Sequence, residues 1–152
     1  MMQDTYRAQP NGPAARILLA EDDGDLRTLL SSKLREAGFE VTEASDGKAL
    51  LEHLTEGYSA DGSYDPFDMV LSDIHMPHFN ALDVMVGARR CLEVTPVVLM
   101  TGFGDAHTHA QALRLGATAV LDKPLRLDAL SATVVEILNQ AGRASAEGRS
   151  RA

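Results

Sequence analysis

Residues 16–23 read RILLAEDD, a continuous apolar run that ends in three consecutive acids. Short unbroken apolar runs are typical of strands that are buried on both faces of a parallel sheet. The helix predicted to follow ends at Gly38 and carries leucines at helical spacing: Leu26, Leu29, Leu30 and Leu34. A buried strand followed directly by an amphipathic helix indicates the start of a βαβ unit.

The same alternation of strand and helix continues along the chain. Further strands are predicted over 39–44, 67–72, 96–100 and 119–121, and further helices over 48–54, from Leu82, over 106–115 and from Leu127. Five strand–helix units predict an α/β fold, with a parallel sheet and helices on both faces. The second strand is the most polar, which favours an edge position.

Both ends of the chain lack apolar periodicity. We therefore predict a disordered arm over 1–15 and a disordered tail over 141–152, around a single domain over 16–140. The tail is too short for a second domain, so we expect either a stand-alone module or a piece of a larger protein.

Composition narrows the classes of function. The formal net charge of −8 argues against direct binding to nucleic acid or to an anionic membrane. The chain shows no signal peptide and no apolar stretch that could span a bilayer. Its single cysteine, Cys91, cannot form an internal disulfide. The cytoplasm is therefore the expected location.

Polar side chains follow four of the predicted strands at their carboxyl ends: Glu21, Asp22, Asp73, Thr101 and Lys123. The carboxyl ends of parallel strands share one edge of a sheet, where ligands of α/β folds bind, so we expect these side chains to converge. Clustered carboxylates favour a hard cation such as Mg²⁺. A lysine and a hydroxyl beside the cation suit a phosphoryl group, and an aspartate there can act as the nucleophile.

Four motifs in this order resemble the CheY-like receiver domain of bacterial two-component signalling: ILLAEDD at 17–23, MVLSDIHMP at 69–77, VVLMTG at 97–102 and GATAVLDKP at 116–124. The resemblance covers roughly residues 16–140. It implies a flavodoxin-like fold whose five strands have the order 2-1-3-4-5. It also implies a response regulator that acts as a switch in signal transduction or a phosphorelay, and not an enzyme that turns over a separate substrate.

The resemblance also implies a role for each residue of the acidic site. Asp73 would become a 4-aspartylphosphate, with a histidine kinase or histidine phosphotransfer protein as donor. Mg²⁺ would bind Asp22, Asp73 and the main-chain carbonyl of His75 directly, and Glu21 through a water molecule.

On the other side of the phosphate, Lys123 would form an ion pair with it, and its peptide bond to Pro124 would be cis. Thr101 would donate a hydrogen bond to a phosphoryl oxygen and swing inward on activation. Downstream proteins would then bind a face formed by helix 106–115, strand 119–121 and helix 127–140.

Three positions depart from the family pattern. Val120 replaces a common aromatic residue that moves together with the threonine, and Ala81 replaces a common glycine. Phe103 is apolar at a position that often influences dephosphorylation, so we expect an unusual phosphoryl lifetime that Phe103→Glu would change. The departures leave open a receiver-like protein–protein adaptor that does not use phosphorylation.

Other readings of the residues are weaker. Asp23-Gly24-Asp25 faintly resembles the nucleophile motif of haloacid-dehalogenase phosphatases, but Arg27 stands where that motif has threonine or valine. A flavin module would need a phosphate-binding loop after the first strand, where the three acids would repel phosphate. His107 and His109 lie two residues apart on the predicted helix and are interpreted as surface histidines.

Overall fold

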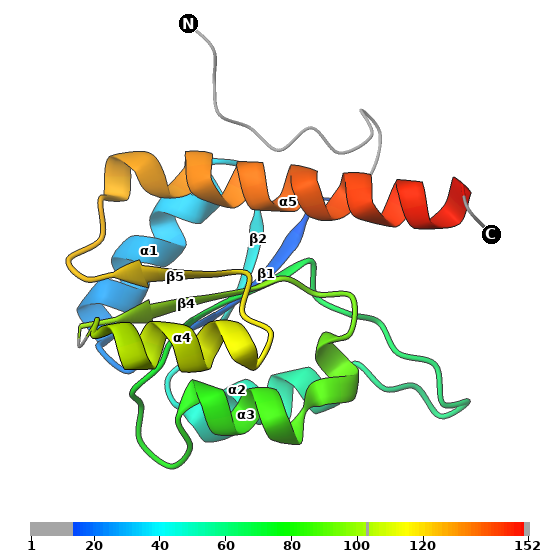
Figure 1. Cartoon of the computed structure of the whole chain (residues 1–152), viewed down its shortest axis with the longest axis horizontal. Coiled ribbons are helices and arrows are strands. Elements are labelled where there is room, and N and C mark those ends of the chain that lie inside the picture. Colours follow the sequence, from blue (N-terminus) through cyan, green and yellow to red (C-terminus); the bar gives the residue numbers. More distant parts are fainter. Residues whose placement is uncertain (1–13, 103, 151–152) are drawn as a thin grey trace, which may run out of the picture.

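The computed structural model describes residues 14–102 and 104–150, in which strands and helices alternate (Figure 1). The elements are β1 (Arg16–Ala20), α1 (Gly24–Glu36), β2 (Glu40–Ala44), α2 (Gly47–Thr55), β3 (Met69–Asp73), α3 (Ala81–Gly87), the 3-10 helix η1 (Arg89–Leu92), β4 (Val97–Thr101), α4 (Ala106–Arg114), β5 (Ala119–Asp122) and α5 (Leu127–Ser150). The predicted strands agree with these bounds to within two residues.

The strands form one parallel sheet in the order β2-β1-β3-β4-β5, which confirms the α/β fold and the strand order implied by the resemblance. β2 lies at an edge, as its polarity predicted. The strand order reverses between β1 and β3, so the carboxyl ends of these two strands flank the position where α/β folds bind ligands.

Helices cover both faces of the sheet (Figure 1). Successive residues of β1 enter different cores, because side chains alternate across a strand. Ile17 and Leu19 pack with residues of α1 and α5, whereas Leu18 and Ala20 pack with residues of α2 and α3. The two cores explain the apolar runs at 17–20 in β1, 69–71 in β3 and 97–100 in β4.

Side-chain caps begin four of the helices shortly after a strand ends. Asp23, Asp46, Asn80 and Asp105 accept hydrogen bonds from main-chain N–H groups at the starts of α1, α2, α3 and α4. A cap of this kind contributes roughly 0.5–2 kcal/mol of helix stability. Of the three consecutive acids, Asp23 therefore caps α1, whereas Glu21 and Asp22 contribute to the group of acids at the carboxyl ends of the strands.

The chain ends differ from the prediction. α5 continues to Ser150, so the prediction of a disordered tail from residue 141 is wrong over 141–150. No proline interrupts this segment, and its alanines favour a continuing helix. Ala15, predicted as part of the arm, is buried, and its carbonyl accepts a hydrogen bond from the Glu40 N–H. Residues 1–13 and 151–152 lie outside the described residues.

The long connection between α2 and β3 carries local structure that the polar sequence did not predict. Tyr58 and Tyr64 form an antiparallel bridge, and their ring centroids are 4.7 Å apart. The Tyr64 hydroxyl donates to the carbonyl of Leu54 at 2.8 Å. These contacts tie the connection to the end of α2. Within the described part of the chain, no helix has the length and apolar content that crossing a bilayer requires.

Candidate functional site

The predicted convergence at the strand ends is confirmed for Glu21, Asp22, Asp73 and Lys123. The ammonium Nζ of Lys123, just after β5, lies 2.6 Å from Oε1 of Glu21 and 2.8 Å from Oδ2 of Asp73. Glu21 follows β1 and Asp73 ends β3, so one lysine joins the ends of three strands. The chemical roles of these residues stay predictions.

Three carboxylates form a group that could hold a metal ion. Glu21, Asp22 and Asp73 each offer one oxygen, and these oxygens lie within 4.8 Å of one another. Glu21 and Asp73 are buried and Asp22 is exposed, so a cation can reach the group from solvent. An all-oxygen donor set suits hard divalent cations.

The remaining predicted ligand, His75, lies in the connection after β3. Its N–H donates to Oδ1 of Asp73 at 3.3 Å, and its side chain is exposed. The two carboxylate oxygens of Asp73 therefore have different partners, since Oδ2 accepts from Lys123. Metal binding by the His75 carbonyl stays a prediction.

Burial and the hydrogen bond from Lys123 shift the pKa of Glu21 in opposite directions. Burial of its carboxyl raises the pKa of Glu21 above the ordinary 4.5, and hydrogen bonds from Lys123 and from the Asp23 N–H offset part of this rise. For Lys123, desolvation lowers the pKa, but the hydrogen bonds to Asp73 and Glu21 outweigh it and leave the pKa above the ordinary 10.5. Lys123 is thus a permanent cation beside Asp73 near neutral pH.

Thr101 ends β4, is fully buried and lies opposite Asp122 of β5 in the sheet register. The main-chain N–H of Lys123 donates to the carbonyl of Thr101 at 2.8 Å, so the two predicted site residues are joined through the backbone. The Lys123–Pro124 peptide bond is cis, which confirms the expectation from the resemblance.

Two of the three departures from the family pattern occupy ordinary packing positions. Val120 is partly buried and packs against the core shared with α2 and α3. Ala81 is buried at the start of α3, and its N–H donates to the Ile74 carbonyl at 2.9 Å. In the same connection, His78 has a positive φ of 73°. Phe103 lies outside the described residues.

Two contacts near the site had no signal in the sequence. Arg27 of α1 donates through Nη1 to the carbonyl of Glu21 at 2.8 Å. His109 of α4, interpreted from the sequence as a plain surface histidine, has its Nε2 2.9 Å from Oδ1 of Asp122. The interpretation as a plain surface histidine is therefore corrected for His109. Its partner lies on another element, so residue spacing along the helix could not reveal the contact.

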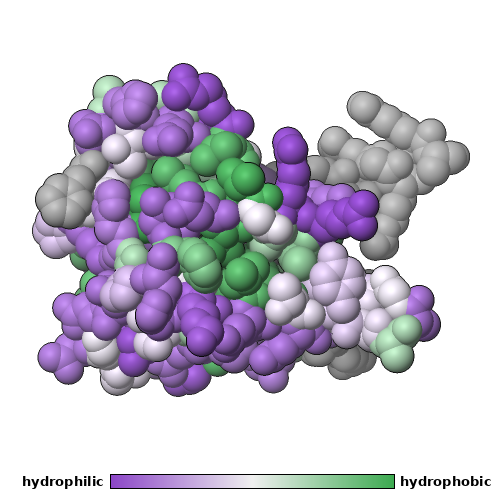
Figure 2. Space-filling model, turned by 90° about the horizontal axis from the view of Figure 1, so that it is seen from below, coloured by the Kyte–Doolittle hydropathy of each residue, from purple (hydrophilic) through white to green (hydrophobic). Residues whose placement is uncertain are grey.

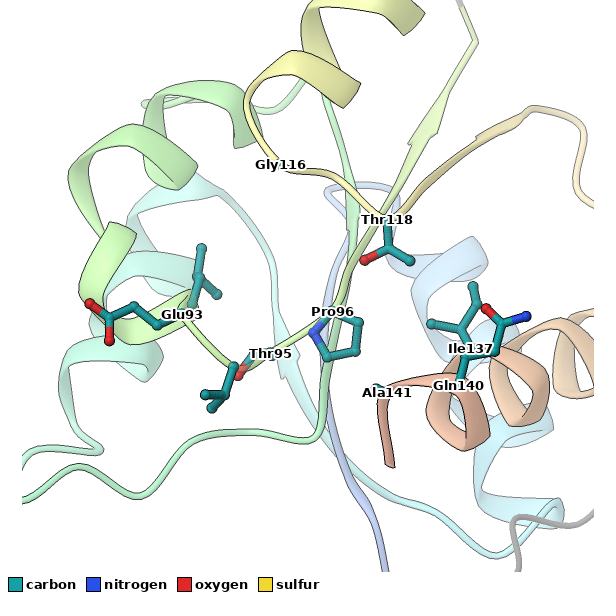
Figure 3. Close-up of a pocket in the computed structure, with 10 residues that line it drawn as sticks. Glu93, Thr95, Pro96, Gly116, Thr118, Ile137, Gln140 and Ala141 are labelled. Atoms are coloured by element: carbon teal, nitrogen blue, oxygen red, sulfur yellow. The ribbon is translucent and has the colours of Figure 1, made fainter. Parts of the chain in front are cut away.

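A separate hollow of about 550 Å³ opens at the opposite edge of the sheet, where β4 and β5 begin (Figure 3). Its lining includes Pro96, Thr118, Ile137 and Gln140, and Glu93 is its one titratable residue. The hollow lacks the clustered acids and the lysine of the site at the carboxyl ends, so it has no comparable chemistry.

Comparison with known proteins identifies the family of this chain. Residues 17–135 match the model of the response regulator receiver domain. The transcriptional regulatory protein FixJ of Bradyrhizobium diazoefficiens is 33% identical over 125 residues, which are 82% of this chain and 57% of FixJ. The receiver protein CpdR of Brucella abortus is 35% identical over 115 residues, which are 74% of this chain and 87% of CpdR.

A solved structure shows the same fold. The CheY-like receiver domain protein of Methanospirillum hungatei has a TM-score of 0.76 at 22% identity, and the match covers 86% of this chain and 98% of that one. Phosphorylation and Mg²⁺ binding are typical of the family that the sequence match identifies. The chain belongs to the response regulator receiver domains of two-component signalling.

Proposed function

We propose that this receiver domain is switched by transfer of a phosphoryl group to Asp73 in the presence of Mg²⁺. The observation that carries the proposal is the position of Asp73. Its Oδ2 lies 2.8 Å from Nζ of Lys123, and one of its carboxylate oxygens lies within 4.8 Å of oxygens of Glu21 and Asp22. A lysine beside an acidic group at a strand end suits a phosphoryl group and its counter-ion.

The transfer forms an acyl phosphate. A carboxylate oxygen of Asp73 donates an electron pair to phosphorus as the bond from phosphorus to the donor's imidazole nitrogen breaks. The leaving imidazole keeps the electron pair of the broken phosphorus–nitrogen bond and takes a proton from solvent. Lys123 and the N–H of His75 hold the two oxygens of Asp73 in place before transfer.

The charge of the site supports a divalent cation. Glu21, Asp22 and Asp73, when ionised, carry three negative charges, and Lys123 carries one positive charge, which leaves −2. Bound Mg²⁺ would neutralise this charge and that of the incoming phosphoryl oxygens. The chain's own part is to supply the carboxylate ligands and to exclude bulk water from Glu21.

The output proposed for the switch is a change at the face made by α4, β5 and α5. Thr101 begins the connection to α4, so its movement toward a phosphoryl group would shift this connection. We propose a histidine kinase or histidine phosphotransfer protein as the donor, a protein partner at that face, and a cytoplasmic location. Apart from accepting and slowly losing its own phosphoryl group, the domain is proposed to turn over no substrate.

Intact-mass measurement after incubation with acetyl phosphate and Mg²⁺ tests the proposal. We expect the wild type to gain the mass of one phosphoryl group, Asp73→Asn to gain none, and removal of Mg²⁺ with EDTA to prevent the gain. Asp83→Asn is the matched control, because Asp83 is exposed on α3 and should leave the gain unchanged. A wild type that gains nothing, or a gain unaffected by Asp73→Asn, would favour the adaptor without phosphorylation.

A further inference from the structure

The contact between His109 and Asp122 joins two elements that the sequence places in separate units. Nε2 of His109, in α4, lies 2.9 Å from Oδ1 of Asp122, the last residue of β5. The His109 side chain is 29% exposed and that of Asp122 is 63% exposed. A contact of this length is a good hydrogen bond, and with a proton on Nε2 the imidazole donates to the carboxylate in either charge state.

α4 buries few of its side chains against the rest of the domain. Ala112 is its one buried residue, whereas α1 has three buried residues and α3 has four. Leu113 of α4 is 52% exposed. Figure 2, which views the molecule from the side of α2, α3 and α4, shows apolar surface left uncovered in the middle of this face. The contact between His109 and Asp122 thus adds a polar attachment to a helix that buries little of its own surface.

Gly104, which precedes α4, lies directly beside this contact. A Cβ added at Gly104 would overlap Oδ1 of Asp122 and would come within 3.3 Å of Nε2 of His109. Gly104 therefore lies directly beside both side chains of the contact, and a larger residue there would require the Asp122 carboxylate to move.

The same contact borders the proposed phosphorylation site. Asp122 precedes Lys123 in the chain and lies opposite Thr101 in the sheet, and the Lys123 N–H donates to the Thr101 carbonyl. A movement of Thr101 toward Asp73 would draw the connection after β4 inward. This movement would carry Gly104 away from Asp122, beside whose Oδ1 it now lies.

We propose that His109 and Asp122 form a latch, which holds α4 and the β4–α4 connection in the unphosphorylated arrangement and opens when Asp73 is phosphorylated. This rests on the proposed function. The latch supplies a polar link between α4 and β5 in a chain that has Val120 in place of the common aromatic residue that moves together with the threonine. It makes His109 a positioning residue for the switch, with no contact to the phosphoryl group itself.

Amide hydrogen exchange in the unphosphorylated, metal-free protein tests the latch without any phosphoryl donor. His109→Ala and Asp122→Ala should each speed exchange of the α4 amides about three- to tenfold, and the double variant should add no more. Asp122→Asn keeps an oxygen acceptor and should restore most of the protection. His107→Ala is the control, because His107 is exposed on the same helix and points to another side. Equal exchange in His109→Ala and His107→Ala would overturn the latch.

The second measurement repeats the exchange after phosphorylation with acetyl phosphate and Mg²⁺. Phosphorylation should speed exchange of the α4 amides in the wild type and in His107→Ala, and should change it little in His109→Ala, whose latch is already open. The same acceleration in all three would overturn the coupling of the latch to phosphorylation. A wild type that takes up no phosphoryl group would overturn the proposed function and this coupling, and the first measurement would still decide whether the contact holds α4.

Discussion

Nζ of Lys123 lies 2.8 Å from Oδ2 of Asp73, although 50 residues separate them in the chain. Because β4 lies between β3 and β5, the lysine reaches past the end of β4 to make this contact. The same Nζ is 2.6 Å from Glu21, whose carboxylate is fully buried. One cation thus compensates two carboxylates of low exposure.

Lys123→Ala should therefore destabilise the metal-free protein. Loss of the ammonium leaves Glu21 and Asp73 without their cation, which we expect to cost about 2 kcal/mol of unfolding free energy. Urea unfolding in EDTA measures this cost. Lys33→Ala is the control, since the Lys33–Glu36 pair is exposed and 3.8 Å long, and its loss should cost less than about 0.5 kcal/mol. Equal costs for the two variants would show that Lys123 does not stabilise the buried acids.

Glu21 should make the metal-free protein less stable as the pH rises above about 4.5. Burial raises the pKa of Glu21 in the folded state, so between the ordinary 4.5 and the raised value the folded protein holds a proton that the unfolded chain has released. Stability falls with pH wherever the folded state binds more protons. Glu21→Gln lacks this proton, so its stability relative to wild type should increase across that window. Urea titrations at several pH values, in EDTA, test the sign, and parallel pH profiles would contradict it.

Mg²⁺ should stabilise the wild type against heat. Free Mg²⁺ at 100 times its Kd would add about 2.7 kcal/mol, because the ion binds the folded acidic group and not the dispersed acids of the unfolded chain. Asp22→Asn should weaken binding and reduce the rise in Tm.

The adjacent Asp23→Asn is the matched control for this experiment. It removes the same charge, but Asp23 caps α1 and asparagine can cap equally well, so the rise in Tm should persist. If both variants lose the rise to the same extent, then general charge and not a built site attracts the cation.

Ser31→Ala should stabilise the protein. Ser31 of α1 is 1% exposed, and its Oγ has no hydrogen-bond partner among the described residues. Removal of a buried unpaired hydroxyl together with a gain in helix propensity should add about 1 kcal/mol of unfolding free energy. Ser32→Ala, at the exposed neighbouring position, should gain only the propensity share of about 0.5 kcal/mol. Chemical denaturation compares the two, and a Ser31→Ala gain no larger than that of Ser32→Ala would count against the unpaired hydroxyl.

Local sequence patterns were sufficient to predict the fold class and most residues of the site. The apolar runs of β1, β3 and β4 record burial on both faces, and Glu21, Asp73 and Lys123 each follow a strand end that parallel strands must share. The order of the strands came from the resemblance, because periodicity reports how deeply an element is buried and not which element lies beside it.

The sequence by itself thus determined five parallel strands, two helical layers and an acidic edge with one lysine. Only the tertiary structure decided that Lys123 also pairs with Glu21, that Arg27 holds the Glu21 carbonyl, and that His109 meets Asp122. Each of these contacts joins different elements, so it depends on sheet register and helix orientation. These are set by packing over the whole core, which no short stretch of sequence contains.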